Sequence, residues 1–272
     1  MRLNVIVPLS RPSMVKNVRA NFERQKFQNK RLVVVQNGPG LGACQNAGFQ
    51  PDVLIEIGKA HQSIAKNTAL EYLRGMGESF FATFDDDDYY GPMYLHDIAD
   101  GFLKGYEVSG KSNIYIRFSD NRMLFAVQTG ESCEVTNVNG PTISGVITKD
   151  TPLFPEIQWG EDNEWLKDAV RLGCRIWSSN RSNFCWMRRG ELHGHTYRIT
   201  DAGLENSIRA LGIVFDCGHF SETVVDGLDA PSRFDRMEPQ EFDFSLHPAV
   251  KIWEEQGDTA KWLTSIRSQF PI

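Results

Sequence analysis

The 272-residue sequence predicts an α/β fold in which a mostly parallel central sheet carries helices on both faces. Strand and helix patterns alternate over the first hundred residues, and short connections join them. The first strand segments, Leu3–Val7 and Arg31–Val35, are nearly continuous apolar runs, which is typical of parallel strands buried on both faces. Sheets of this class bind ligands where the carboxyl ends of their strands meet. Functional residues are therefore expected directly after the strands.

The N-terminal third supplies four predicted strands with helices between them. Pro8 stops the first strand, and Ser13 is expected to cap a helix that runs past Phe22. The second strand ends in a dense turn cluster, Gln36–Gly40. The remaining elements of this third are strands at Val53–Ile57 and Phe80–Phe84, a helix from Ser63 to Leu73 ended by Gly75, and a helix from Pro92 through Leu103.

The middle third changes character, because its patterns predict an antiparallel pair at Asn113–Phe118 and Arg122–Val127. An amphipathic helix is predicted at Glu161–Leu172, with Gly173 closing it. Shorter strands are predicted at Pro141–Thr148, Arg175–Ser178 and Asn183–Met187, and helical patterns recur near Ala202–Leu211, His247–Glu255 and Thr259–Ser268.

The composition is that of a folded, water-soluble chain, with 41% hydrophobic and 24% charged residues, which excludes a disordered or fibrous protein. No apolar run approaches the roughly 18 residues that a membrane span needs, and the N-terminus lacks the apolar stretch of a signal peptide. We therefore expect no integral membrane segment and a cytoplasmic location. The five cysteines are widely spaced and contain no CxxC pair, which predicts free thiols.

Charge is distributed unevenly along the chain. The net charge of −6 argues against a general nucleic-acid binder. Residues 171–198 nevertheless contain six arginines and a single acid, whereas residues 199–272 contain 13 acids and six basic residues. The basic stretch favours a site for phosphate-bearing ligands, and the acidic tail is readily explained as solvated surface.

Four consecutive aspartates, Asp85 to Asp88, directly follow the predicted strand Phe80–Phe84. Adjacent carboxylates repel one another unless a positive charge neutralises them, and a divalent cation with oxygen ligands does so directly. A solvated acidic loop or a helix-capping run before Pro92 is the alternative. The position at the carboxyl end of a strand favours the metal site.

The order of motifs resembles the nucleotide-sugar glycosyltransferases of family 2, which have the GT-A fold with its Rossmann-like sheet. The resemblance rests on strings that stand in consistent order over residues 3–198: the strand with Pro-x-x-Arg-Pro, VVVQNG, Ser-x-Ala-Lys-Asn, FDDDDYYGP, WGEDNEW and RRGELHGHTYR. It implies transfer of a sugar from a nucleotide-diphosphate sugar to an acceptor hydroxyl, with inversion at the anomeric carbon and Mn²⁺ or Mg²⁺ as cofactor.

The resemblance also assigns donor-side roles. Pro8 would border the nucleotide base, and Asn37 would hydrogen-bond it where the family often has an aspartate. Asp85 would contact the ribose, and Asp87 would ligate the metal that bridges the diphosphate, with His195 as a late metal or phosphate ligand. The other residues placed near the donor are Lys66, Asn67 and Asp86, with Asp88 as an alternative to Asp86 in assisting the metal.

Two departures from the family strings concern the donor. Gln36 and Asn37 replace the usual acidic pair, so an amide would contact the base, and amides both donate and accept. Lys66 replaces an arginine and removes a bidentate fork. These changes leave the identity of the nucleotide open.

On the acceptor side, the resemblance makes Asp162 the catalytic base that removes a proton from the acceptor hydroxyl. Acceptor or phosphate roles are further implied for Glu161, Trp159, Arg188, Arg189 and His193. A helix-capping pair stabilised by the helix dipole is the alternative for Glu161 and Asp162.

The organisation expected from these motifs is a GT-A domain at 1–198 and a helical or irregular extension at 199–272. Within the GT-A domain, residues 1–104 would bind the nucleotide sugar and residues 105–198 the acceptor. The acceptor class stays open between a glycan and a hydroxymethylated DNA base. A non-catalytic nucleotide-sugar or carbohydrate-binding protein is the alternative function, since such a protein needs Asp87 but no base at Asp162.

Overall fold

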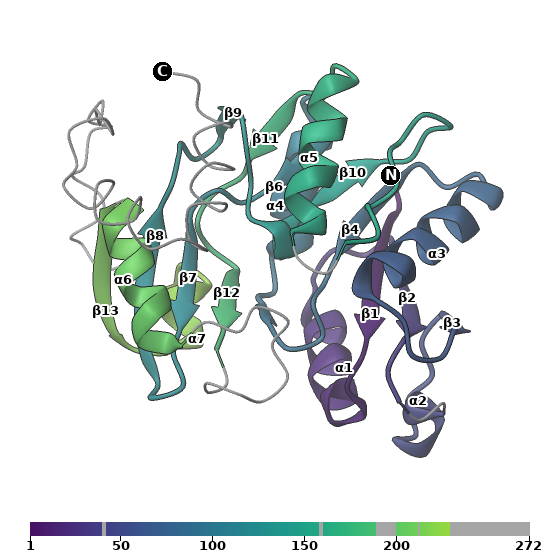
Figure 1. Ribbon diagram of the computed structural model, residues 1–272, viewed down its shortest axis with the longest axis horizontal. Coiled ribbons are helices and arrows are strands. Elements are labelled where there is room, and N and C mark those ends of the chain that lie inside the picture. Colours follow the sequence, from purple (N-terminus) through teal and green to yellow (C-terminus); the bar gives the residue numbers. More distant parts are fainter. Residues whose placement is uncertain (40–41, 158–159, 189–199, 212, 229–272) are drawn as a thin grey trace.

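The computed structural model describes residues 1–39, 42–157, 160–188, 200–211 and 213–228. These residues form two sheets that lie side by side (Figure 1). The larger sheet has eight strands, in the spatial order β3 (Val53–Glu56), β2 (Lys30–Gln36), β1 (Leu3–Leu9), β4 (Phe80–Thr83), β10 (Ser144–Val146), β6 (Val108–Gly110), β11 (Ile176–Ser178) and β9 (Cys133–Val135). The smaller sheet has the order β13 (Ile213–His219), β8 (Arg122–Val127), β7 (Ile114–Arg117), β12 (Phe184–Met187) and β5 (Tyr89–Tyr90).

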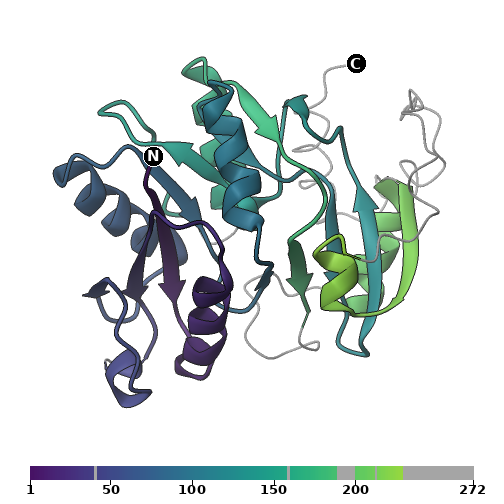
Figure 2. The same cartoon turned by 180° about the vertical axis from the view of Figure 1, so that it is seen from behind.

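The large sheet confirms the predicted α/β class. Strands β1 to β4 are parallel to one another, whereas β10 runs antiparallel between β4 and β6. Its two faces are covered by different helices, α1 (Val15–Arg24) and α4 (Tyr94–Leu103) on one side and α3 (Gln62–Gly75) and α5 (Glu161–Arg171) on the other (Figures 1 and 2).

The alternation of side chains along β1 explains this double covering. Val5 and Val7 pack in the core that includes α1 and α4, whereas Ile6 packs in the core that includes α3 and α5. Successive side chains of a strand point to opposite faces, so a strand buried on both sides must be apolar at nearly every position. The run at the N-terminus meets that requirement.

The smaller sheet includes part of the region that we assigned to a C-terminal extension. Strand β13 pairs antiparallel with β8, and α6 (Asp201–Leu211) precedes it, as the helical pattern near Ala202–Leu211 predicts. The short helix α7 (Glu222–Val225) follows, and Val225 packs against the sheet's buried aromatic side chains. The patterns at 247–255 and 259–268 lie outside the described residues.

Several local expectations differ from the structure. Ser13 caps no α-helix, because Pro12–Met14 forms a 3₁₀ turn and α1 begins at Val15 without a side-chain cap. Gly75 belongs to α3, and Gly77, with φ of +71°, follows the helix in the left-handed conformation. The segment predicted as one strand at 141–148 is a 3₁₀ turn, Gly140–Thr142, followed by β10. Sequence patterns also missed the short helix α2 (Ala43–Asn46).

Within the described part of the chain, no helix has both the length and the apolar character that crossing a bilayer requires.

Candidate active site

The candidate site lies at the edge of the large sheet where parallel strands β1, β2 and β4 end. The loops after β1 and β2 touch closely, since a Cβ on Gly38 would stand 1.9 Å from the carbonyl oxygen of Ser10. Only glycine allows this approach. The aspartate run follows β4 at the same edge, so three loops that are distant in sequence converge there.

An aromatic stack shapes the aspartate turn. Phe84 and Tyr90 are stacked with ring centroids 3.9 Å apart, and the backbone N–H of Asp85 donates to the Tyr90 hydroxyl at 2.7 Å. The same hydroxyl donates to the carbonyl of Pro141 at 2.9 Å. A buried tyrosine therefore closes the turn and connects it to the segment before β10.

The four aspartates have different partners. Asp85 accepts a hydrogen bond from Gln62 at 2.8 Å, and burial raises its pKa to about 7 against the opposing effect of Lys66. Asp86 is 3% exposed and accepts from the backbone N–H groups of Ser10 and Arg11 at 3.2 and 3.3 Å. These bonds anchor the β1–α1 loop to the turn.

Arg11 binds two of the aspartates at once. Its guanidinium forms a short ion pair with Asp86, and its Nη1 lies 2.8 Å from Oδ2 of Asp87. Asp88 points elsewhere, because its Oδ1 accepts the backbone N–H of Met187 in β12 at 2.9 Å. Burial, together with the charges of Asp87 and Asp85, raises the pKa of Asp88 well above its usual range.

Lys66 and Asp162 form a second charged pair at the site. Lys66 lies on α3 and is fully buried, and its Nζ is 2.6 Å from Oδ1 of Asp162 and 3.5 Å from Oε1 of Glu161 at the start of α5. Burial acts to lower the pKa of Lys66, but the charges of Asp162, Glu161 and Asp85 raise it above its usual range. Burial raises the pKa of Glu161. The ammonium thus binds the two acidic residues at the start of α5.

The absence of a side chain at Gly140 allows the side chain of Asp162 to pack against the backbone there. A Cβ at Gly140 would lie 2.7 Å from Oδ2 and 2.9 Å from Cβ of Asp162, closer than side chains tolerate. Gly140 begins the 3₁₀ turn that precedes β10, and Glu161 and Asp162 are in the first turn of α5. The carboxylate is therefore fixed by an ammonium at one oxygen and fits closely against the backbone at the other.

Of the remaining predicted donor residues, Asn37 and Pro8 are buried and Asn67 is half-buried. Asn37 is 3% exposed, and its amide donates to the carbonyl of Ala60 at 3.0 Å, while its buried Oδ1 has no partner among the described residues. Pro8 is buried within β1, opposite Val35 in register. Asn67 donates to the carbonyl of Phe154 at 2.8 Å and accepts its N–H at 2.7 Å, so this amide holds the loop before α5.

The arginine-rich stretch is largely neutralised by acidic partners. Its four described arginines each lie within 4 Å of a carboxylate: Arg171 with Asp168, Arg175 with Glu107, Arg181 with Glu131 and Arg188 with Asp201. Arg188, predicted to contact acceptor or phosphate, is 1% exposed. Trp159, Arg189, His193 and His195 lie outside the described residues.

Sequence reasoning missed the roles of Arg11, Gln62 and Gly140. Arg11 has no role in the sequence-based prediction beyond its place in Pro-x-x-Arg-Pro, although the sheet brings a cation after β1 and an anion run after the adjacent parallel strand to one edge. Gly140 gives no comparable signal, because its role depends on a helix that starts twenty residues later.

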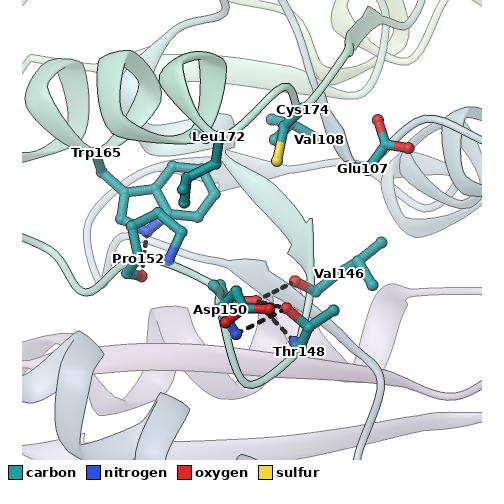
Figure 3. A pocket seen from close by; sticks show the side chains of 11 residues that line it. Glu107, Val108, Val146, Thr148, Asp150, Pro152, Trp165, Leu172 and Cys174 are labelled. Carbon is teal, nitrogen blue, oxygen red and sulfur yellow. Dashed lines mark hydrogen bonds between the residues drawn. The ribbon is translucent and has the colours of Figure 1, made fainter.

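A separate cavity of about 340 Å³ lies at the opposite edge of the sheet, near the starts of β6 and β11 (Figure 3). Trp165 of α5 lines it and donates its indole N–H to the carbonyl of Pro152 at 2.8 Å, and Cys174 and Glu107 lie across from it. None of the predicted site residues lines this cavity.

No family model matches the sequence, and no curated protein matches it. Solved structures do match the fold. TarS 1-349 of S. aureus, in complex with UDP-GlcNAc, has a TM-score of 0.54 at 19% identity, over 71% of this chain and 60% of that one. The mannosyltransferase PcManGT of Pyrobaculum calidifontis, in complex with GDP-Man and Mn²⁺, has a TM-score of 0.50 at 15% identity, over 71% and 58%.

The chain thus spans about 60% of the length of these proteins. At such identities the likeness establishes the arrangement of the backbone. The doubly covered sheet and these matches together show that the chain has the GT-A fold.

Proposed function

We propose that the protein is a metal-dependent, inverting glycosyltransferase that moves a sugar from a nucleotide-diphosphate sugar to an acceptor hydroxyl. One observation carries the proposal: the aspartate turn after β4 and the Lys66–Asp162 pair meet at one edge of a GT-A sheet. The turn is bonded to α3 through Gln62 and to Pro141 through Tyr90, while Lys66 of α3 and Gly140 both lie against Asp162. The solved structures that share this fold hold UDP-GlcNAc and GDP-Man, which supports a nucleotide sugar as the donor class.

The nucleotide would lie over the loops after β1 and β2. The buried Oδ1 of Asn37 is an acceptor without a partner among the described residues, and an N–H of a nucleobase would supply the missing donor. Asp85, two residues after the end of β4, would contact the ribose hydroxyls. Pro8 would support the base from within the strand, and Asn67 would act indirectly through the loop at Phe154.

The residues fit a divalent metal that the donor itself helps to bind. The described residues hold no preformed group of three metal-ligating side chains. Mg²⁺, however, is commonly bound by one or two carboxylates together with substrate phosphates and water. Asp87 would be the carboxylate ligand, with Asp86 or Asp88 assisting. Mn²⁺ or Mg²⁺ would neutralise the charge that develops on the leaving diphosphate.

Asp162 would accept the proton of the attacking hydroxyl. The ammonium of Lys66 fixes its Oδ1 and Gly140 lies beside its Oδ2, so the carboxylate cannot turn away from the site. Direct displacement by a hydroxyl activated by one base inverts the anomeric carbon. Glu161 would support Asp162 through the shared lysine.

For the acceptor we propose the hydroxyl of a glycan. The basic stretch that would favour DNA with hydroxymethylated bases is occupied by internal ion pairs at all four of its described arginines. A polyanionic acceptor would have to compete with those pairs. Arg189, His193, His195 and Trp159 stay predictions for acceptor or phosphate contacts.

The direct test is a thermal-shift series with UDP, GDP and the corresponding nucleotide sugars, each with and without Mn²⁺. A ligand that binds only the folded state stabilises it by mass action and so raises the melting temperature. At a ligand concentration one hundred times the dissociation constant, the free energy of unfolding rises by about 2.7 kcal/mol. We expect a shift for one base, dependent on metal and abolished in Asp87→Asn. Absence of a shift for every nucleotide would refute the donor site. Binding without turnover in the presence of a broad glycan panel would favour the binding-protein alternative.

A further inference from the structure

Arg11 is a cation already present where the proposed function places a metal. Its Nη1 lies 2.8 Å from Oδ2 of Asp87, and the rest of its guanidinium binds Asp86. The two carboxylates are nearly inaccessible, with side chains 2% and 9% exposed, whereas the Arg11 side chain is 24% exposed. The guanidinium therefore lies at the entrance of the aspartate turn, between it and solvent.

The two ion pairs of Arg11, with Asp86 and with Asp87, differ in how much they contribute to holding the loop. Asp86 also accepts the backbone N–H groups of Ser10 and Arg11, so its bond to the loop survives without the guanidinium. Asp87 is bound to the loop through the side chain of Arg11. A second cation at Asp87 would repel this guanidinium at close range, because like charges a few ångströms apart destabilise each other strongly in a partly buried site.

We propose that Arg11 couples metal binding to diphosphate binding. This inference rests on the proposed function. The metal must displace the guanidinium of Arg11 from Asp87, so the metal alone binds weakly. A nucleoside diphosphate offers new anionic oxygens to the displaced guanidinium. A guanidinium can donate two parallel hydrogen bonds to one phosphate group. The metal and the diphosphate then each improve the affinity of the other, as linkage requires.

The test measures Mn²⁺ affinity directly, from the electron paramagnetic resonance signal of free Mn²⁺, with and without UDP or GDP. In the wild type we expect weak binding of Mn²⁺ alone and at least tenfold tighter binding with the preferred nucleotide, within the usual range of coupling. In Arg11→Gln we expect Mn²⁺ alone to bind about tenfold tighter than in the wild type. The nucleotide should then improve Mn²⁺ affinity by a smaller factor than in the wild type, because its phosphates still ligate the metal but no longer receive a displaced guanidinium.

Two further variants keep the result interpretable. Arg11→Lys keeps the charge but cannot span both carboxylates, so its affinity for Mn²⁺ should lie between those of the wild type and Arg11→Gln. If Arg11→Gln does not fold, Arg11→Lys takes its place in the comparison. Arg31→Gln is the matched control, because Arg31 is similarly exposed at 23% and pairs with Glu78 at 2.7 Å near the start of β2. It should leave Mn²⁺ binding unchanged.

The outcomes separate this inference from the proposed function. Equal Mn²⁺ affinity in wild type and Arg11 variants, with nucleotide coupling intact in both, would overturn the role of Arg11 and leave the donor site standing. Failure of the wild type to bind Mn²⁺ with any nucleoside diphosphate would overturn both.

Discussion

Lys66 and Lys111, the two fully buried lysines in the part of the chain that the structure describes, have different surroundings. Lys111 lies after β6 and donates to Asp97 at 3.0 Å, to the hydroxyl of Ser179 at 3.1 Å and to the carbonyl of Asn180 at 2.9 Å. Lys66 has two carboxylate partners, Asp162 at 2.6 Å and Glu161 at 3.5 Å. Burial lowers the pKa of Lys111, whereas the surrounding negative charge raises that of Lys66 despite equal burial.

We expect this difference to separate a structural ion pair from one that belongs to the proposed site. Around Lys111 all three ammonium donors are used and Asp97 also accepts from Asn180 and Asn183, so the network is complete. Around Lys66 negative charge is in excess, which is costly for folding alone and is the arrangement expected where a substrate or cation completes a site. The predictions below test whether the two lysine networks separate in this way.

The largest effect is expected at the carboxylate partners. Asp162→Asn should lower transfer by about 10²- to 10⁴-fold while donor binding stays as in the wild type, because an amide cannot accept the hydroxyl proton. The measurement is turnover with nucleotide sugar alongside nucleotide affinity. Asp97→Asn is the counterpart: it should lower the melting temperature but leave turnover per folded molecule unchanged. Unimpaired transfer in Asp162→Asn would remove the base assignment.

Removing the structural lysine should act on stability. Lys111→Met leaves Asp97 as an uncompensated buried charge, so we expect the free energy of unfolding to fall by about 3–5 kcal/mol in denaturant titration. Lys104→Met is the control, since Lys104 pairs with Asp100 at the surface and its loss should cost less than about 1 kcal/mol. If Lys111→Met instead reduced nucleotide affinity of the folded protein, Lys111 would belong to the site and the contrast would collapse.

The close fit around Asp162 offers a test without changing any charge. Gly140→Ala should displace the carboxylate, because the added Cβ would lie 2.7 Å from its Oδ2, and a shift of about 1 Å can cost on the order of 10²-fold in rate. Nucleotide affinity should be retained. Gly75→Ala, in α3, adds a Cβ that meets no atom within 4 Å and should leave turnover unaltered. Equal turnover in both variants would mean that Asp162 does not depend on this fit.

Sequence reasoning reached the fold because its signals are local. Strands that are buried on both faces are apolar at nearly every position, so β1, β2 and β4 could be recognised from the sequence. The location of the aspartates at the edge of the sheet then follows, because they come directly after the segment recognised as β4. The second sheet was only partly predictable. Strand β13 is recognised by its pairing with β8, some ninety residues earlier, and no local periodicity encodes that partner.

The site was predictable in its residues but not in its pairings. The nucleotide-side role of Lys66 stays a prediction, and its pairing with Asp162 was not predicted, because the packing of α3 against α5 decides which side chains meet. Arg188 was expected to face a ligand and is buried against Asp201 of a region that matched no family string. Charge type can be predicted from sequence, whereas the partner of each charge depends on packing.

The smallest effect should come from Asn67, which the resemblance places beside the donor. Its two hydrogen bonds hold Phe154, whose ring stacks on Trp165 with centroids 5.2 Å apart and lies 5.0 Å from Nζ of Lys66. Asn67→Ala should therefore lower the free energy of unfolding by about 1–2 kcal/mol, the value of one or two ordinary hydrogen bonds. Nucleotide affinity should change little. Turnover should fall slightly, because the loop that carries Phe154 would pack less firmly against Lys66. A large loss of nucleotide affinity with unchanged stability would instead place Asn67 in direct contact with the donor, and the functional region of α3 would then extend beyond Lys66.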